Sequence, residues 1–315
     1  MDYVQWTNET SITTFIFLGF QSLHQFQLLL FLLFLVVYIA TVAGNLLIVT
    51  LVAADRHLHT PMYFFLANLS VLETLYSSVI TPRLLSDCLS KSRTISLGGC
   101  ITQLLLYSSL ACIECFLLAI MALDRYLAIC KPLSYQVIMN FKVCLQLVTA
   151  SWLIGLSVSS LVVGMVSKLH FCGPNEIDHF ICDMNQLTKL SCKKSILAER
   201  TVLVSCSIVT LGPFVLIVVS YVYILAAILR IASSSGRQKA FSTCASHLVV
   251  VSLYYGTIVI MYVVPTKNQS PAFQKAISLL YTVITPLFNP IIYSLRNQEV
   301  QGAFKKLLLH NLGMK

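Results

Sequence analysis

The chain has 315 residues, of which 57% are hydrophobic and only 10% are charged, and its mean hydropathy is +0.82. Soluble domains carry about 25% charged residues, so this composition excludes an ordinary soluble fold and predicts an integral membrane protein. The net charge of +9 at pH 7 comes without a long basic run. It therefore favours lysines and arginines gathered at the cytoplasmic face and argues against nucleic-acid binding.

Long apolar runs dominate the chain, and a helix needs roughly 20 apolar residues to cross a bilayer. Seven such runs lie at residues 26–54, 62–86, 97–129, 143–166, 202–231, 245–264 and 272–295. They are continuous, whereas the strands of a membrane barrel alternate over about 10 residues. Because lipid offers backbone groups no partners, we expect helices. The predicted fold class is an all-α membrane protein with a seven-transmembrane helix bundle.

Charge beside the first run sets the predicted orientation. No Lys or Arg precedes this run and Arg56 follows it, which places the amino terminus outside the cell and the carboxyl terminus inside. The missing basic start also argues against a cleavable signal peptide. We expect an extracellular tail at 1–24, a transmembrane domain at 25–297 with a long second extracellular loop at 167–201, and a cytoplasmic segment at 298–315.

Both ends of the chain carry further signals. Asn8 opens the sequon Asn-Glu-Thr in the outer tail, where we expect glycosylation. Basic and apolar residues alternate over 298–309, which predicts a short amphipathic helix on the inner leaflet with Lys305 and Lys306 facing anionic lipid.

Cysteines on the oxidising side should pair, although spacing alone does not fix the pairing. Those expected outside are Cys88, Cys100, Cys172, Cys182 and Cys192. His179 lies close to Cys182 and Asp183, which suggests a metal site. The alternative, which we favour, is a disulfide-bonded Cys182 beside an exposed His179, because a disulfide sulfur does not bind a metal as a thiolate does.

Glu73 and Glu114 lie inside the second and third runs. An unpaired carboxylate in a bilayer is costly, so both are functional candidates.

Several motifs follow one another in order along nearly the whole chain. They are Gly44-Asn45, Pro61-Met62-Tyr63, Asp124-Arg125-Tyr126, Ser220-Tyr221, Lys239-Ala240-Phe241-Ser242-Thr243-Cys244 and Asn289-Pro290. The Pro-Met-Tyr and Lys-Ala-Phe-Ser-Thr-Cys stretches are typical of odorant receptors, whereas the Asp-Arg-Tyr and Asn-Pro stretches belong to the wider rhodopsin-like superfamily. The chain therefore resembles an odorant (olfactory) receptor of the tetrapod type, within the rhodopsin-like (class A) G protein-coupled receptors.

This resemblance implies the disulfides Cys100–Cys182 and Cys172–Cys192, and leaves Cys88 without an assigned partner. It also implies a sodium ion, not a required cofactor, in the bundle core. The residues implied for it are Glu73, Glu114, Asn45 and Asn289. The second-run position is Asp in many members and Glu73 here, and a protonated, hydrogen-bonded carboxyl pair is the alternative.

The resemblance also implies an inner switch that faces the G protein. Its residues would be Asp124, Arg125, Tyr126, Tyr221, Asn289, Pro290 and Tyr293. The alternative for Arg125 is a simple interfacial anchor that snorkels, and the tyrosines could be anchors near the headgroups. Pro290 breaks one backbone bond and permits a kink, which favours the switch.

A ligand pocket is implied in the outer half of the bundle. Counting from the motifs gives Tyr107, Ser108, Ala111, Cys112, Ser205, Val209, Tyr255, Ile258, Val259, Tyr262 and Thr282. The set is apolar with a few hydroxyls and contains no Lys or Arg, so it suits a small volatile better than a carboxylate. Plain helix packing is the alternative for any one of them.

The expected function is that of an odorant receptor. It would bind a small volatile and activate a stimulatory, olfactory-type heterotrimeric G protein, raising cAMP. The expected location is the plasma membrane, in the cilia of olfactory sensory neurons. No nucleophile–base arrangement predicts an enzyme. A transporter that uses Glu73 and Glu114 as an ion or proton relay is the alternative, although no internal repeat supports it.

Overall fold

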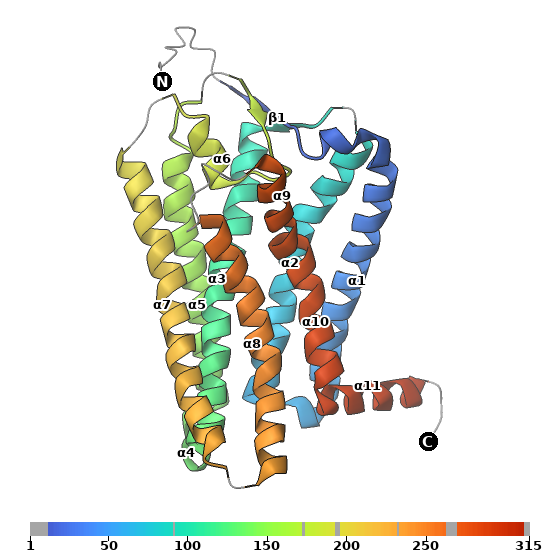
Figure 1. The fold of residues 1–315 in the computed structure, drawn as a ribbon, viewed down its shortest axis with the longest axis vertical. Helices are drawn as coiled ribbons and strands as arrows, with labels where there is room; N and C mark the ends of the chain where they lie inside the picture. The colour runs from blue at the N-terminus through green and yellow to red at the C-terminus, as the bar shows by residue number, and fades with distance from the viewer. Residues whose placement is uncertain are drawn as a thin grey trace.

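The computed structural model describes residues 12–90, 92–171, 174–192, 196–231, 233–262 and 270–311. Within these residues, seven helices are long and apolar enough to cross a membrane. They stand side by side in one bundle, with a small β-sheet at one end and a crosswise helix at the other (Figure 1). This arrangement confirms the predicted seven-helix fold.

Most crossing helices end close to the predicted limits. They are α1 (Gln27–Ala54), α2 (Pro61–Leu89), α3 (Leu97–Cys130), α5 (Phe141–Val166), α7 (Ile196–Leu229), α8 (Ser234–Tyr262), and a seventh built from α9 (Pro271–Leu279), a π-helical turn (Leu280–Ile284) and α10 (Thr285–Arg296). Two begin earlier than expected: α7 starts at Ile196 rather than 202, and α8 at Ser234 rather than 245. The added turns are polar, so hydropathy alone misses them.

Polarity in the bundle is inverted relative to a soluble protein. Leu28 and Leu29 of α1 are 66% and 62% exposed, whereas Asn45 of the same helix is fully buried. Glu73 and Glu114 are buried as well. Such a surface is suited to lipid, and the polar side chains have only one another as partners.

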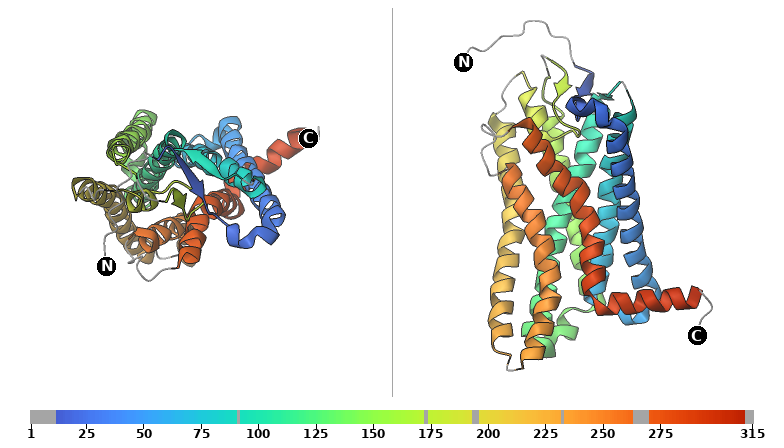
Figure 2. Two further views of the ribbon diagram at one scale, coloured as in Figure 1. Left: turned by 90° about the horizontal axis from the view of Figure 1, so that it is seen from above. Right: turned by 45° about the vertical axis from the view of Figure 1, so that its right-hand side comes forward.

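The α3 helix runs through the middle of the bundle and packs against α2, α5 and α7 (Figure 2). Gly155 allows α5 to approach α3 closely, because a Cβ there would lie 2.5 Å from Ile113 Cγ1 and 3.2 Å from the Ser109 carbonyl oxygen. Small residues let helix backbones come together in a membrane, where dispersion contacts drive association.

A three-stranded sheet caps the end of the bundle at which α1 begins, called the outer end after the predicted orientation. Its order is β2-β1-β3: β1 (Thr14–Phe17) pairs antiparallel with β2 (Thr94–Ser96) and parallel with β3 (Glu176–Ile177). Phe15 and Phe17 of β1 are buried. The predicted tail at 1–24 therefore includes an ordered strand, which is followed by a 3-10 helix (Gln21–Phe26). Gly19 makes the turn between them with a φ of +46°, a conformation that favours glycine.

The second outer loop is bonded to α3 through the disulfide Cys100–Cys182, whose Cα atoms lie 5.5 Å apart. Cys192 is also disulfide-bonded, while Cys172 lies outside the described residues, as does Asn8. Cys88 is a free, buried thiol. The loop also contains the short helix α6 (Met184–Lys189).

Two short helices lie at the inner end, α4 (Pro132–Ile138) and α11 (Gln298–Asn311). The α11 helix runs crosswise to the bundle (Figure 2). Val300 and Ala303 of α11 are buried, while Lys306 points outward and lies 3.3 Å from Asp55 Oδ2. The amphipathic character is as predicted, although Phe304, expected on the apolar face, is 38% exposed.

Candidate functional site

Tyr107, the outermost residue of the predicted α3 pocket face, turns toward α2 and the seventh helix. Its hydroxyl forms a hydrogen bond with the hydroxyl of Tyr281, and its ring centroid lies 5.7 Å from that of Tyr76 and 6.1 Å from that of Tyr281. Tyr281 belongs to the π-helical turn, and such turns are frequent at functional sites. The sequence reading missed Tyr281, although it directly precedes the predicted residue Thr282.

The rest of the α3 face meets α8 and α5. The Tyr254 hydroxyl of α8 donates to the carbonyl oxygen of Ala111 over 2.6 Å. Cys112 instead accepts a hydrogen bond from Ser159 Oγ of α5 at 3.5 Å, so its thiol faces the side of the bundle where α5 lies. Ser108 is half-buried, and its hydroxyl donates to the Leu105 carbonyl oxygen at 3.3 Å.

Most of the predicted residues of α7 and α8 are buried or half-buried. Val209 and Tyr255 are buried, and the Tyr255 hydroxyl donates to the Cys115 carbonyl oxygen of α3 at 3.5 Å. Ser205 and Ile258 are half-buried. The set is apolar with scattered hydroxyls, as expected for a site that takes a small apolar ligand.

Three predicted ligand residues differ from the others in where their side chains lie or in whether these are described. Val259 is 44% exposed and shares the outward face of α8 with Ser252 and Gly256, so its predicted place in the pocket is wrong. The reason is helical phase, because Val259 is rotated by about 100° from Ile258. Thr282 is buried, but its hydroxyl donates to the Ser278 carbonyl oxygen of its own helix at 2.7 Å. The side chain of Tyr262 lies outside the described part of the chain.

An open cleft lies at the outer end of the bundle, between α6, α8 and α9, and His179, Met261 and Ser278 line it. The Ile181 amide donates to His179 Nδ1 at 3.3 Å, so His179 Nε2 carries the proton and donates to Ser278 Oγ at 3.0 Å. Ser278 Oγ in turn donates to Met261 Sδ at 3.3 Å. The second outer loop is thereby joined to both α9 and α8.

His179 is buried rather than exposed, contrary to the sequence expectation. Burial, with Lys275 as the next cause, lowers its pKa from 6.5 to about 4, so the imidazole is neutral at pH 7. The alternative metal site finds no support, because Cys182 is disulfide-bonded. Within the described residues, no group of three His, Cys, Asp or Glu side chains is placed to hold a metal.

Deeper in the bundle, the predicted sodium residues do come together. Asn289 Nδ2 donates to Glu73 Oε1, and the carboxyl groups of Glu73 and Glu114 lie within hydrogen-bonding reach of each other. Asn45 Nδ2 donates to the Pro286 carbonyl oxygen at 3.1 Å.

The atoms of this cluster that lack a hydrogen-bond partner are all oxygen acceptors. Asn45 Oδ1, Glu114 Oε1 and Asn289 Oδ1 are buried and have no hydrogen-bond partner among the described residues. Oxygens that only accept are the ligands a hard cation prefers, so the donor set fits a sodium ion. A proton shared by the two carboxyls would also fit their contact.

At the inner end of α3, the carboxylate of Asp124 makes polar contacts with two side chains. Arg125 Nη2 lies 3.6 Å from Asp124 Oδ2, and the Tyr135 hydroxyl of α4 donates to Asp124 Oδ1 at 2.7 Å. The Tyr126 ring packs on Tyr223 of α7 at 5.8 Å. Asp124 is buried, so the Asp124–Arg125 pair differs from an exposed interfacial anchor.

Tyr221, one of the implied switch residues, is hydrogen-bonded to His247. Its hydroxyl donates to His247 Nδ1 at 2.8 Å, because His247 Nε2 donates to the Leu118 carbonyl oxygen at 3.1 Å. His247 thus joins α7, α8 and α3. His247 was not predicted as a functional residue from the sequence; a histidine in an apolar run was the available signal.

Tyr293 lies close to Pro290 on α10, and its hydroxyl is buried without a hydrogen-bond partner among the described residues. Pro290 lies inside the helix, where it cannot donate a backbone hydrogen bond. An unsatisfied buried hydroxyl costs free energy, and in a native fold it marks a group that is used in another arrangement.

Comparison with known proteins shows which family this chain is similar to. The sequence profile of the olfactory receptor family matches residues 34–311. Olfactory receptor 10A7 of Homo sapiens is 48% identical over 308 residues, which cover 98% of each chain. Olfactory receptor 11L1 of Homo sapiens is 47% identical, covering 98% of this chain and 95% of its own.

Similarity extends to a second organism. Olfactory receptor 5AP2 of Mus musculus is 44% identical over 308 residues, covering 98% of this chain and 97% of its own. These relatives are receptors, which agrees with a protein that is not an enzyme and gives the transporter alternative no support.

Proposed function

Since the chain belongs to the olfactory receptor family, we propose that it binds a small, largely apolar volatile in the outer half of the bundle and activates a stimulatory, olfactory-type heterotrimeric G protein. Activation would raise cAMP. The protein would act in the plasma membrane of olfactory cilia, with its glycosylated amino terminus outside and α11 on the cytoplasmic side. The domain limits proposed are the outer segment 1–24, the receptor domain 25–297 and the cytoplasmic segment 298–315.

Buried and half-buried apolar side chains on α3, α7 and α8 are the observation that supports the ligand proposal. Val209, Tyr255 and Ile258 supply apolar surface, while hydroxyls such as that of Ser108 offer single hydrogen bonds. Burial supplies affinity for a volatile of this kind and one hydrogen bond orients it. The predicted lining has no basic side chain that would pair with a carboxylate.

The inner end supports the G protein proposal. Helix α4 has no buried residue, and Leu133 and Val137 on it are 98% and 77% exposed. An exposed apolar patch that is rimmed by polar groups marks a site of protein–protein contact. The Tyr135 hydroxyl of α4 donates a hydrogen bond to Asp124. A partner that binds α4 could therefore alter the contact between the Asp124 carboxylate and Arg125.

A volatile panel with a cAMP reporter tests ligand and coupling together. On any active volatile, Ile258→Ala should weaken potency about tenfold, because one pocket contact is worth about 1–3 kcal/mol. Val259→Ala is the matched control, since this neighbouring side chain points outward and should leave potency unchanged. Equal effects of the two substitutions would contradict the placement of the pocket.

Coupling is tested separately at α4. Leu133→Asp should abolish the cAMP response while ligand binding and surface expression persist, because it charges the exposed apolar patch. Lys142→Gln changes a charged residue at the same inner end and serves as the control. A full cAMP response from the Leu133→Asp variant would contradict the coupling proposal.

We further propose that Glu73, Glu114, Asn45 and Asn289 hold a sodium ion that stabilises the resting receptor. Three partnerless acceptor oxygens in this cluster support it. Sodium, compared with N-methylglucamine, should raise the melting temperature of the purified receptor, and Glu114→Gln should remove the difference. A sodium-independent melting temperature in the unmodified protein would favour the shared proton instead.

A further inference from the structure

A second cleft lies away from the proposed odorant region, on the side of the bundle where α1 and α2 meet the outer cap. Its walls come from the amino-terminal segment, the start of α1, the end of α2 and the second outer loop. Residues that the argument uses are Phe17, Phe20, Leu30, Asp87, Cys88 and Phe180. The odorant region is built from α3, α7 and α8, so the two places share no lining residue named here.

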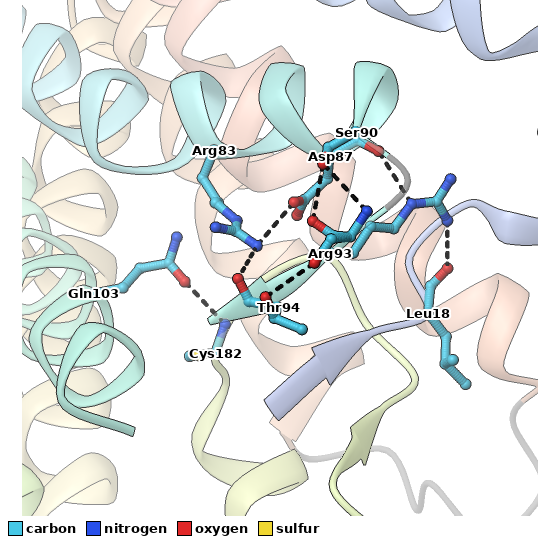
Figure 3. A network of polar contacts seen from close by, with 9 residues as sticks. Leu18, Arg83, Asp87, Ser90, Arg93, Thr94, Gln103 and Cys182 are labelled. Carbon is cyan, nitrogen blue, oxygen red and sulfur yellow. Dashed lines mark hydrogen bonds and ion pairs between the residues drawn. The ribbon is translucent and has the colours of Figure 1, made fainter. Parts of the chain in front are cut away.

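A network of polar groups lies at this end of α2, with Asp87 at its centre (Figure 3). Asp87 is 8% exposed, and its Oδ1 lies 2.9 Å from Arg83 Nη2. Arg83 Nη2 also donates to the Thr94 carbonyl oxygen at 2.8 Å. Arg93 donates from Nε to the Asp87 carbonyl oxygen at 3.1 Å and from Nη1 to the Leu18 carbonyl oxygen at 3.4 Å. Arg83 thus holds the carboxylate of Asp87, and Arg93 holds the backbone of the same residue.

Three buried atoms of this network, Arg83 Nε and both carboxylate oxygens of Asp87, form no hydrogen bond among the described residues, and of the two oxygens only Oδ1 has an ion-pair contact, with Arg83. Asp87 Oδ2 is buried and has no hydrogen-bond partner among the described residues. A buried carboxylate oxygen that accepts nothing costs free energy, so a donor brought to it is stabilising. Asp87 is one of the residues that line the cleft, so a molecule bound there would lie beside this carboxylate and could supply the donor.

The remainder of the cleft is aromatic and aliphatic. The Phe20 and Phe180 rings stack with their centroids 5.5 Å apart, and both rings line the cleft. Phe17 and Leu30 add further apolar surface. A ligand with an apolar body and one polar end would therefore match the cleft along its length.

Charge decides the nature of the polar end. Two guanidinium groups and one carboxylate surround it, so the local net charge is about +1, which disfavours an ammonium group. Asp87 Oδ2 is itself a carboxylate oxygen, which disfavours a ligand carboxylate. A neutral hydroxyl donates one hydrogen bond and carries no charge, and so meets both conditions.

We propose that this cleft is a second binding site, which takes a small neutral alcohol or phenol whose hydroxyl donates to Asp87 Oδ2 while its apolar body packs on Phe17, Phe20 and Phe180. Such a ligand would join the amino-terminal segment to α2 and the second outer loop. The site is separate from the proposed odorant region and does not rest on G protein coupling.

Cys88 offers a local readout, because its free thiol lines the same cleft. The full-length receptor in nanodiscs would be labelled with monobromobimane, and the signal of the Cys88→Ser variant subtracted to remove the other free thiols. Labelling would be repeated in the presence of 1-octanol, octanoate or octylamine, which share a chain and differ in the polar end. 1-Octanol should protect Cys88 at concentrations at least about tenfold lower than the other two, the ratio that corresponds to 1.4 kcal/mol.

Two variants separate the site from a general effect on the bilayer. Leu30→Trp fills the apolar part of the cleft without touching the polar network, and should abolish protection by 1-octanol. Asp87→Leu removes the acceptor and leaves two guanidinium groups, so it should abolish the preference for 1-octanol and shift protection toward octanoate; if it does not fold, the ranking of the three head groups in the unmodified receptor and Leu30→Trp still decide. These readouts involve no G protein, so they stand or fall separately from the proposed function.

Several results would overturn the proposal. Protection by 1-octanol that survives in Leu30→Trp would show a bilayer effect rather than a site. Equal protection by all three compounds, or stronger protection by octanoate or octylamine, would contradict the role of Asp87. Absence of any Cys88 labelling in the free receptor would show that the cleft is closed to small molecules, and would also refute it.

Discussion

The two ends of the bundle are held together by different kinds of bond. At the outer end, backbone pairing of β1 with β2 and β3, a disulfide and the buried His179 join segments that are far apart in the sequence. At the inner end, single tyrosine hydroxyls make the corresponding contacts: Tyr135 to Asp124, Tyr221 to His247 and Tyr63 to Asn297.

The difference bears on how such a protein moves. Backbone ladders and disulfides give way only when a whole segment comes apart, whereas a tyrosine hydroxyl leaves its partner by rotation of one side chain. The outer end is therefore suited to keeping a ligand site in shape, and the inner end to changing between arrangements. A receptor that carries a signal inward needs this asymmetry.

Breaking the outer end covalently should have the largest effect. The disulfide Cys100–Cys182 closes a loop with a sequence separation of 82, and a crosslink of that span contributes about 4 kcal/mol. Cys100→Ser should therefore abolish surface expression, measured by antibody binding to intact cells. Cys88→Ser, which removes a free thiol, should leave expression near normal; equal loss in both variants would contradict the comparison.

Lowering the pH should reduce the stability of the fold through protonation of His179 at the outer end. Its pKa is about 4 in the fold and about 6.5 when exposed, so the unfolded state binds more protons between these values. The stabilisation is complete above about pH 6.5 and is lost as pH falls toward 4, and at pH 5 the loss is about 2 kcal/mol. Lys275, Asp178 and Lys189 are the charged groups that act on this imidazole.

The measurement is the melting temperature of the purified receptor at pH 7 and pH 5, with an expected drop of a few degrees. His179→Gln keeps a donor for Ser278 and cannot titrate, so its drop should be smaller. An unchanged pH dependence in this variant would assign the acid effect to other groups.

At the inner end, His247→Phe should raise basal cAMP signalling about fivefold. The substitution removes the bonds to Tyr221 and to the Leu118 carbonyl oxygen, which hold the arrangement in which Arg125 is close to Asp124. A net loss of about 1 kcal/mol corresponds to that factor. Ser252→Ala, on the exposed face of the same helix, is the control; basal signalling below that of the unmodified receptor would reverse the assignment.

The smallest effect is expected at α11. The Tyr63 hydroxyl donates to Asn297 Oδ1 at 2.9 Å and to Glu299 Oε2 at 2.8 Å. Tyr63→Phe should increase hydrogen exchange in α11 several-fold, since loss of one such bond costs about 1 kcal/mol. Tyr38→Phe removes an exposed hydroxyl bond to Ser78 and should leave α11 exchange unaltered. The comparison of the two ends would weaken if both variants behaved alike.

Hydropathy was sufficient to predict the crossing helices, because a continuous apolar run of about 20 residues matches the thickness of a bilayer. It missed the polar turns of α8 before 245 and the strand β1, whose four residues are too few for a clear alternation. The family resemblance predicted that Glu73 and Asn289 lie at one site, and their side chains are hydrogen-bonded to each other.

Pocket residues were harder to predict than spans. Ile258 and Val259 are equally apolar, and only helical phase against neighbouring helices separates the inward from the outward side chain. The roles of Tyr281 and His247 depend on partners in distant helices, and no local pattern encodes such partners.

The position of β1 in the middle of its sheet constrains how the chain is made. This strand leaves the ribosome first, yet its neighbours β2 and β3 follow only after the second and fourth crossing helices. With the amino terminus outside, as proposed, residues 14–17 remain unpaired there until β2 has been made, and their other edge remains unpaired until β3 has been made, when more than half of the chain exists. A bulky fusion that tethers or shields this stretch during synthesis would therefore delay maturation of the receptor even though it touches neither ligand nor G protein.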